Sequence, residues 1–229
     1  KDFYPLGPWA SVQFAGKVYD LPMDSGPMAF HRNKEVFDRA GVDADSIKTW
    51  MITMRLPRRF TRLETVITSH PIQMMVDSMT PWFGSLTTIK TSSDSTEVTA
   101  NLTGDEGVRK FDTFWQKMLD EGLLDTKTTG WTEGWLGMVD GVIASLFSGA
   151  WMPADIANSA ADGAGKWRVA QMPTADGSST NVENGGSSLA VLSSSKKVQA
   201  AYDFIEYANH GDGVAARVAG GAFPADKKS

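Results

Sequence analysis

The sequence predicts an α/β fold, because strand-like apolar runs alternate with amphipathic helical segments along its 229 residues. Three of the strand-like runs are PMAFHR, GVIASLFSGAW and KWRVAQMP, each followed by polar or turn-forming residues. Two longer segments, TGDEGVRKFDTFWQKMLDEG and SSKKVQAAYDFIEYANH, carry apolar residues at helical spacing. A chain of this length can form one large domain or two small ones.

Turn residues divide the first part of the chain. GKVYDLPMDSG is strand-like and turns at Pro22 and Gly26. The segment NKEVFDRAG that follows PMAFHR predicts a short helix. Its N-cap is expected at Asn33, and Gly41 can end it in the left-handed conformation.

The clearest helix is expected near the middle of the chain. Thr103 and Glu106 form the capping-box pattern that often precedes a helix. The apolar residues that follow at helical spacing are Val108, Phe111, Trp115 and Met118. This face is expected to pack in the core, which makes Trp115 a structural residue.

The C-terminal part predicts a further strand, GSSLAVL, and then an amphipathic helix. The residues expected on one face of that helix are Val198, Ala201, Tyr202 and Ile205. The following segment GDGVAA resembles a dinucleotide-binding turn, but it follows a helix, whereas that turn requires a preceding strand. We therefore expect no nucleotide there.

Composition excludes several kinds of function. The formal net charge of −5 argues against a nucleic-acid partner, and the absence of cysteine excludes disulfides and thiolate metal sites. The three histidines, His31, His70 and His210, lack a second ligand at metal-binding spacing, so no metal is expected. No apolar run approaches the length of a membrane span.

Tryptophan is abundant, with eight residues, and indole faces suit both protein cores and the apolar faces of sugar rings. Trp151 differs from the others because it follows the strand-like run SLF directly in the small-residue turn SGAW. Ends of elements are where ligands are commonly met. We therefore expect Trp151 to face a ligand.

Four segments in a fixed order resemble a known family: GKVYDLPMDSGPMAFHRNKEVFDRAG, KTW, SGAWMPADI with GKWRVAQMP, and NGGSSLAVLSSSKKVQAAYDFIEYAN. Together they resemble the extracellular solute-binding proteins of bacterial sugar ABC transporters, the class that includes maltose-binding protein. The resemblance covers residues 16–50 and about 92–229.

The resemblance implies a two-lobe periplasmic-binding-protein-like fold, truncated here at both ends. Residues 1–23 would hold the end of the first lobe and the first hinge crossing, and residues 24–183 the second lobe. Residues 184–229 would hold the return crossing and part of the first lobe. We expect the segments 23–26 and 185–188 to lie side by side as the two crossings.

The same resemblance implies a ligand site at these crossings. Its expected residues are Asp24, Ser25, Trp151, Gly185, Gly186 and Ser187. The aromatic residue would stack on a sugar ring, Asp24 would accept hydrogen bonds from hydroxyl groups, and the two glycines would allow close backbone approach and flexing. No catalytic residue and no metal ligand is implied.

The function implied is oligosaccharide binding between the lobes, for delivery to the permease subunits of an ABC importer. It needs no cofactor, no catalysis and no nucleic acid. The protein would act outside the cytoplasmic membrane, in the periplasm or on the cell surface, held only by a lipid anchor that this chain lacks. Two alternatives stay open: a carbohydrate-active hydrolase, and a solute-binding protein for a non-sugar ligand such as a polyamine or peptide.

Residues 51–75 depart from the family pattern. They contain Arg55, Arg58, Arg59 and Arg62 but a single acidic residue, Glu64, where the family typically has an acidic amphipathic helix such as DDYYEAAKKI. Ten codons for that helix, read one base late, can encode MITMRLPRR followed by Phe or Leu, and the chain has MITMRLPRRF. We therefore interpret residues 51–76 as an out-of-frame reading and expect an irregular segment with exposed arginines; a basic surface loop or nucleic-acid patch is the alternative.

Overall fold

A computed structural model provides the fold. The residues that it describes are 3–49, 66–68, 89–91, 97–100, 103–104, 106–122, 124, 126, 137–174, 177–179, 181 and 183–226.

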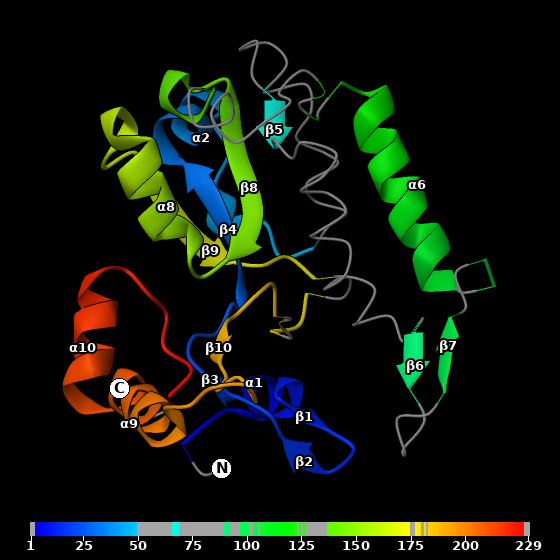
Figure 1. The fold of residues 1–229 in the computed structure, drawn as a ribbon. Coiled ribbons are helices and arrows are strands. Elements are labelled where there is room, and N and C mark those ends of the chain that lie inside the picture. The colour runs from blue at the N-terminus through cyan, green and yellow to red at the C-terminus, as the bar shows by residue number, and fades with distance from the viewer. Residues whose placement is uncertain are drawn as a thin grey trace.

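A four-stranded mixed sheet forms the centre of one part of the molecule (Figure 1). Its strands, in spatial order, are β5 (Val66–Thr68), β8 (Ile143–Gly149), β4 (Met28–Asn33) and β9 (Trp167–Gln171). Strand β4 is antiparallel to both β8 and β9, whereas β5 runs parallel to β8. The run GVIASLFSGAW contains β8, as predicted, and every residue of this strand is buried, including Ser145 and Ser148.

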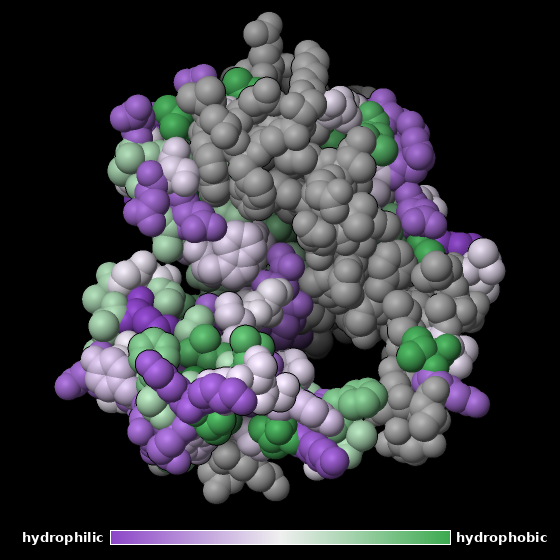
Figure 2. All heavy atoms as spheres, in the orientation of Figure 1, coloured by the Kyte–Doolittle hydropathy of each residue, from purple (hydrophilic) through white to green (hydrophobic). Residues whose placement is uncertain are grey.

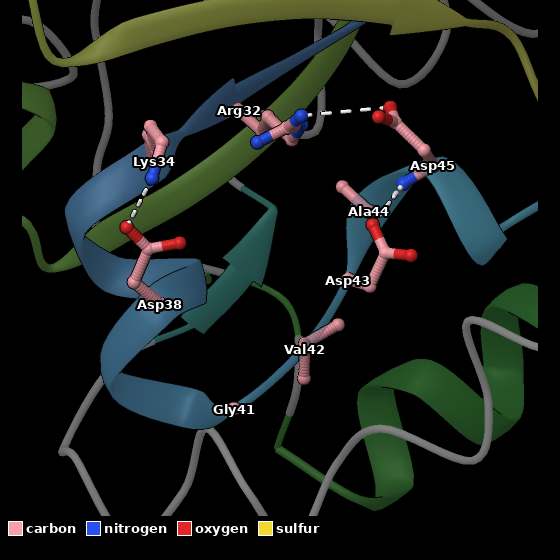
Figure 3. Close-up of a pocket in the computed structure, with 8 residues that line it drawn as sticks. All are labelled: Arg32, Lys34, Asp38, Gly41, Val42, Asp43, Ala44 and Asp45. Atoms are coloured by element: carbon pink, nitrogen blue, oxygen red, sulfur yellow. Dashed lines mark hydrogen bonds and ion pairs between the residues drawn. The ribbon is translucent and has the colours of Figure 1, made fainter.

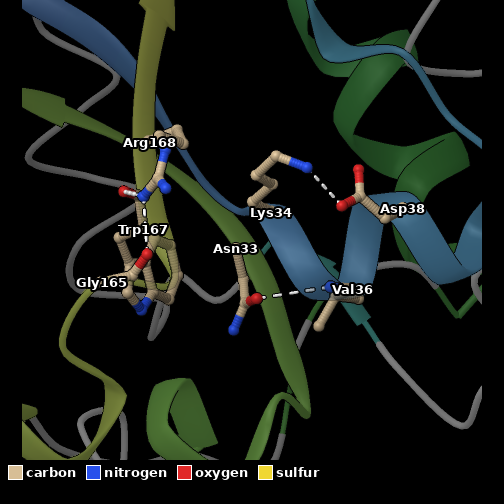
Figure 4. A network of polar contacts seen from close by, with 7 residues as sticks. All are labelled: Asn33, Lys34, Val36, Asp38, Gly165, Trp167 and Arg168. Atoms are coloured by element: carbon tan, nitrogen blue, oxygen red, sulfur yellow. Dashed lines mark hydrogen bonds and ion pairs between the residues drawn. The ribbon is translucent and has the colours of Figure 1, made fainter.

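Helix α2 (Lys34–Ala40) follows β4 and has the caps that the sequence predicts. The Asn33 side chain accepts a hydrogen bond from the Val36 amide at 3.3 Å (Figure 4), and Gly41 has a φ of 64° at the other end. A 3-10 turn, Ala44–Ser46, comes next. Asn33 and Gly41 thus determine the two ends of α2 through local sequence.

Helix α6 (Glu106–Asp120) supplies the aromatic side of the main core. Its predicted inner face is confirmed, since Val108, Phe111, Trp115 and Met118 are all buried. Of these four, Phe111, Trp115 and Met118 belong to a cluster that also contains residues of β4, α2 and β8. A second cluster joins β8 to helix α8 (Met152–Ser159), which the 3-10 turn Ala161–Gly163 follows.

The predicted start of α6 is wrong. A capping box at Thr103 and Glu106 would begin the helix at residue 104, but α6 begins at Glu106. Thr103 and Gly104 lie in a preceding turn, where the Thr103 carbonyl accepts a hydrogen bond from Arg109 at 3.4 Å. Glycine loses much conformational freedom in a helix, which disfavours helical structure at Gly104.

The remaining described elements lie apart from the sheet in Figure 1, among them a hairpin of β6 (Ile89–Thr91) and β7 (Val98–Ala100) near one end of α6. The others, in chain order, are α1 (Leu6–Ser11), β1 (Gln13–Phe14), β2 (Lys17–Val18), β3 (Leu21–Pro22), β10 (Ser188–Leu189), α9 (Val198–Asn209) and α10 (Gly211–Ala219). The segment GDGVAA thus lies within α10 and forms no phosphate-binding turn.

The predicted inner face of α9 is only partly buried. Ile205 is 5% exposed, but Val198 and Tyr202 are 55% and 50% exposed. Phe204 and Tyr207 on the same helix are exposed as well. Figure 2 shows this mixed character, with hydrophobic side chains scattered among hydrophilic ones over the part of the molecule that contains α9. Sequence periodicity locates an apolar face, but the neighbouring elements decide whether that face is covered.

The arginine-rich segment 51–65 lies outside the described residues, and so does the expectation that Arg55, Arg58 and Arg59 are exposed. Residues 66–68, which fall within the segment expected to be irregular, form strand β5, with Val66 opposite Ile143. The expectation of irregular structure is therefore wrong for these three residues. Their β-branched side chains suit a strand beside the buried β8.

Candidate ligand-binding site

Two chain segments pass side by side between the two parts of the molecule, as predicted. Strands β3 and β10 pair antiparallel, with Pro22 opposite Ser188. Beyond them the Met23 amide donates to the Ser187 carbonyl at 2.8 Å, and the Asn184 amide donates to the Gly26 carbonyl at 2.7 Å. The adjacency of residues 23–26 and 185–188 is thus confirmed.

A third segment, near the C-terminal end of α10, joins this crossing, and sequence reasoning missed it. The Ser25 amide donates to the Phe223 carbonyl at 3.0 Å, and the Ala225 amide donates to the Met23 carbonyl at 3.4 Å. The Arg217 guanidinium donates to the same Met23 carbonyl and, at 2.9 Å, to the Ala208 carbonyl at the end of α9. The crossing is therefore a three-segment structure.

Asp24 lies in the crossing and is half-buried. Its carboxylate accepts a hydrogen bond from the Ser187 amide. Gly186 has a φ of 108°, and a Cβ atom there would lie 3.2 Å from the Asp24 carbonyl oxygen. Residue 186 is consequently restricted to glycine by both conformation and space.

Ser25 is 7% exposed and is used within the protein. Its hydroxyl donates to the two carboxylate oxygens of Glu183 at 2.9 and 3.0 Å, and the Gly26 amide donates to the same carboxylate at 2.7 Å. Glu183 is exposed and was missed by sequence reasoning. The available signal was its position directly before the NGG turn.

Trp151 follows the last residues of β8 and is the N-cap residue of α8. Its half-buried indole packs against the second core cluster, and its Nε1 donates to the Asn184 carbonyl at 3.1 Å. A Cβ atom at Gly185 would lie 3.5 Å from that Nε1 atom. The six residues expected at the site, Asp24, Ser25, Trp151, Gly185, Gly186 and Ser187, are thus brought together at one crossing.

The crossing presents acidic side chains that the described residues do not neutralise. Among those residues, neither Asp24 nor Glu183 forms an ion pair. Both accept hydrogen bonds from backbone amides instead. Carboxylates held in this way can accept further hydrogen bonds from the hydroxyl groups of a ligand.

His31 lies under the turn that leads to Trp151. It is 1% exposed on β4, and its Nε2 lies 3.3 Å from the Ser148 carbonyl oxygen of β8. Burial lowers the pKa of His31 from 6.5 to about 4, although hydrogen bonds to the carbonyls of Ser148 and Gly149 act in the opposite direction. The imidazole is therefore neutral at pH 7. Burial also raises the pKa of the Asp155 carboxyl on α8.

An open hollow of about 460 Å³ lies elsewhere, where α2 meets the turn that follows it (Figure 3). Its charged side chains are paired with each other: Arg32 with Asp45 at 3.5 Å, and Lys34 with Asp38. A further lining residue, Asp43, accepts a hydrogen bond from the Asp45 amide at 3.0 Å, and none of the predicted site residues lines this hollow.

Within the described ranges, two further kinds of functional feature are absent. No group of three or more histidine, aspartate or glutamate residues is placed to hold a metal ion there. Among the described helices, none combines the length and apolar character needed to cross a membrane.

The architecture is the α/β fold of the two-lobe periplasmic binding proteins. Residues 1–209 match the family of bacterial extracellular solute-binding proteins, and the chain belongs to that family. It is 26% identical to an arabinooligosaccharide-binding protein of Halalkalibacterium halodurans, over 84% of this chain and 44% of that protein. It is 25% identical to a lactose-binding protein of Rhizobium radiobacter, over 83% and 45%.

Solved structures agree with this assignment. An ABC-transporter-associated binding protein from B. animalis subsp. lactis, in complex with β-1,6-galactobiose, is 57% identical, with a TM-score of 0.88 over 99% of this chain and 56% of that one. The galacto-N-biose/lacto-N-biose I-binding protein of Bifidobacterium longum is 24% identical, with a TM-score of 0.84, and shows the same fold. The chain spans about half the length of these relatives.

Proposed function

We propose that this protein binds a short β-galactoside at the crossing between its lobes and delivers it to an ABC importer. The 57% identity to the protein solved with β-1,6-galactobiose carries this proposal. Lactose, named for one curated relative, shares a β-linked galactose with that disaccharide. Arabino-oligosaccharides, named for the other relative at 26% identity, are the competing ligand class.

The chemistry of the crossing suits a neutral, hydroxyl-rich ligand. The indole of Trp151 offers an apolar face for a sugar ring, and Asp24 and Glu183 offer hydrogen-bond acceptors. Gly185, Gly186 and Ser187 offer exposed backbone that a ligand can approach. Ser25 acts indirectly in this proposal, because its hydroxyl orients the Glu183 carboxylate.

The proposed activity is capture without catalysis. In this proposal residues 24–183 form one lobe, while residues 1–23 and 184–229 contribute the crossings and part of the other. The partners are the permease subunits of the importer, and the place of action is outside the cytoplasmic membrane. Membership of an extracellular solute-binding family supports both the partners and the place of action.

The absence of catalysis is tested by incubating the protein with β-1,6-galactobiose and analysing the mixture by chromatography. We expect no free galactose.

Calorimetry on the full gene product tests the ligand class. The panel contains β-1,6-galactobiose, lactose, an arabino-oligosaccharide, the α-linked disaccharide melibiose, spermidine and a short peptide. We expect β-1,6-galactobiose to bind most tightly, and melibiose at least about tenfold more weakly, which corresponds to about 1.4 kcal/mol. Tight binding of spermidine or the peptide, with no response to any β-galactoside, contradicts the proposal.

Replacing Trp151 by alanine should weaken binding of β-1,6-galactobiose by roughly ten- to a hundredfold. Burial of a large apolar side chain contributes about 1.5–3 kcal/mol, and each 1.4 kcal/mol is a factor of ten. From the sequence alone, Trp151→Ala is expected to keep the stability of the wild type. Because the half-buried indole packs against the core, we now expect this variant to lose a moderate amount of stability as well.

Trp167→Ala is the matched control for Trp151→Ala. Trp167 is also half-buried and packs against the same cluster, but it lies on the edge strand β9. We expect this variant to lose stability while it keeps the affinity of the wild type. Equal affinities for the two alanine variants would remove Trp151 from the site.

A further inference from the structure

We infer that Gly149 is a positioning residue for Trp151, and that it acts together with the backbone carbonyl of Asn184. This inference rests on the proposed function, because it concerns how the indole is held at the sugar site. Gly149 itself is buried at the end of β8 and need not touch a ligand.

Residue 149 is restricted to glycine because a side chain would not fit there, and not because its backbone conformation requires glycine. Its φ is not positive, and it pairs with Met28 in the ladder between β4 and β8. A Cβ atom at this residue would lie 2.8 Å from Cδ1 of Trp151 and closer still to Nε1. The edge of the indole therefore lies directly against the Gly149 backbone, where any larger residue would push it away.

Three residues surround the Asn184 carbonyl group: Trp151, Gly149 and Gly26. Trp151 Nε1 donates to it at 3.1 Å, and a Cβ atom at Gly149 would lie 2.7 Å from its oxygen. A Cβ atom at Gly26 would lie 3.0 Å from the Asn184 carbonyl carbon. Two glycines, one from the sheet and one from the first crossing, thus make room for one carbonyl group, and the indole N–H binds it.

This arrangement fixes the indole to the return crossing. The N–H edge of the ring is bound to Asn184, whose own amide donates to Gly26, so the hydrogen bonds tie the orientation of the ring to the segment that contains Asp24. Stacking on a sugar depends on that orientation because dispersion contacts weaken steeply with separation. A methyl group at residue 149 should therefore reduce affinity by tilting the indole, without removing any ligand contact.

The test compares Gly149→Ala with Gly163→Ala in the full gene product. Gly163 is a good control because it is buried beside the Nε1 of another indole, that of Trp167, but its Cβ would have 3.7 Å of room. Two readouts are taken: calorimetry with β-1,6-galactobiose, and the ¹⁵N–¹H NMR signal of the Trp151 indole, assigned from its loss in Trp151→Phe. We expect Gly149→Ala to shift that signal and to weaken binding at least about tenfold, and Gly163→Ala to change neither.

A double variant separates positioning from general packing. In a Trp151→Phe background, which lacks the N–H edge, Gly149→Ala should weaken binding by a clearly smaller factor than in the wild type, since coupled residues are not additive. The crowding of the new methyl group against the Asn184 oxygen is present in both backgrounds and does not contribute to this difference. Equal effects in both backgrounds, or an unshifted indole signal, would overturn the inference. If Gly149→Ala does not fold, folding of the double variant supports the inference, and its failure to fold overturns it. If the wild type binds no sugar, the proposed function fails, whereas the NMR comparison still decides the role of Gly149.

Discussion

Trp115→Ala should lower the free energy of unfolding by about 3–5 kcal/mol, the usual cost of removing a large aromatic side chain from a packed core. The indole is 5% exposed and lies edge-on to the ring of Phe114, with ring centroids 5.2 Å apart. It also contacts Phe111 at 5.9 Å within the cluster that joins α6 to the sheet. Chemical unfolding followed by circular dichroism measures the loss.

Leu119→Ala on the same helix is the control. Leu119 is 39% exposed, so its truncation should cost less than about 1 kcal/mol. Sugar affinity should be unchanged in both variants at temperatures where they are folded, because α6 contributes no residue to the crossing. A similar loss of stability in the two variants would mean that α6 does not pack on the sheet through its predicted face.

Local signals in the sequence were enough to predict α2 and the strands β4, β8 and β9, but not the strand β5 of the same sheet. Asn33 caps its helix with its own side chain, and Gly41 ends it, so both signals act within a few residues of where they occur. The strand β8 likewise lies within one strand-like segment of the sequence, GVIASLFSGAW. Such elements can be predicted because their determinants are close together along the chain.

Features that depend on distant segments were not predictable in the same way. Burial along α9 depends on which elements cover it, and the face expected to be buried leaves Tyr202 half exposed. The hydrogen bond from the Arg217 guanidinium to the Met23 carbonyl joins residues 194 positions apart, and no local sequence pattern predicts it. Thr103 shows the opposite error, since a local capping pattern was present but the helix began further on.

The candidate site was predicted through resemblance and not through residue patterns. Asp24 and Ser187 are 163 positions apart, so only the pairing of the two crossings brings them together. Glu183 was missed although it binds both Ser25 and Gly26. A single acidic residue in a polar loop has no periodicity that could mark it, and its role becomes visible only from the hydrogen bonds it accepts.

Stability should fall as the pH is lowered from about 6.5 to about 4, and His31 should be a principal cause. Burial lowers its pKa in the folded protein to about 4, whereas in the unfolded chain it stays near 6.5. Between these values the unfolded state binds one more proton, so each pH unit costs about 1.4 kcal/mol. The contribution of the neutral imidazole is complete above pH 6.5, and roughly 2 kcal/mol of it is lost between pH 7 and pH 4.5.

The variant His31→Gln isolates this effect, because glutamine cannot titrate but can still donate a hydrogen bond to the Ser148 carbonyl that lies 3.3 Å from Nε2. Its absolute stability should be lower at pH 7, since it fits the buried space less well. The quantity to compare is the change in unfolding free energy between pH 7 and pH 4.5. Carboxyl groups, including Asp155 with its raised pKa, contribute equally to both proteins and cancel in the comparison. The wild type should lose roughly 2 kcal/mol more than His31→Gln over this interval, and equal losses would show that His31 is protonated in the folded state.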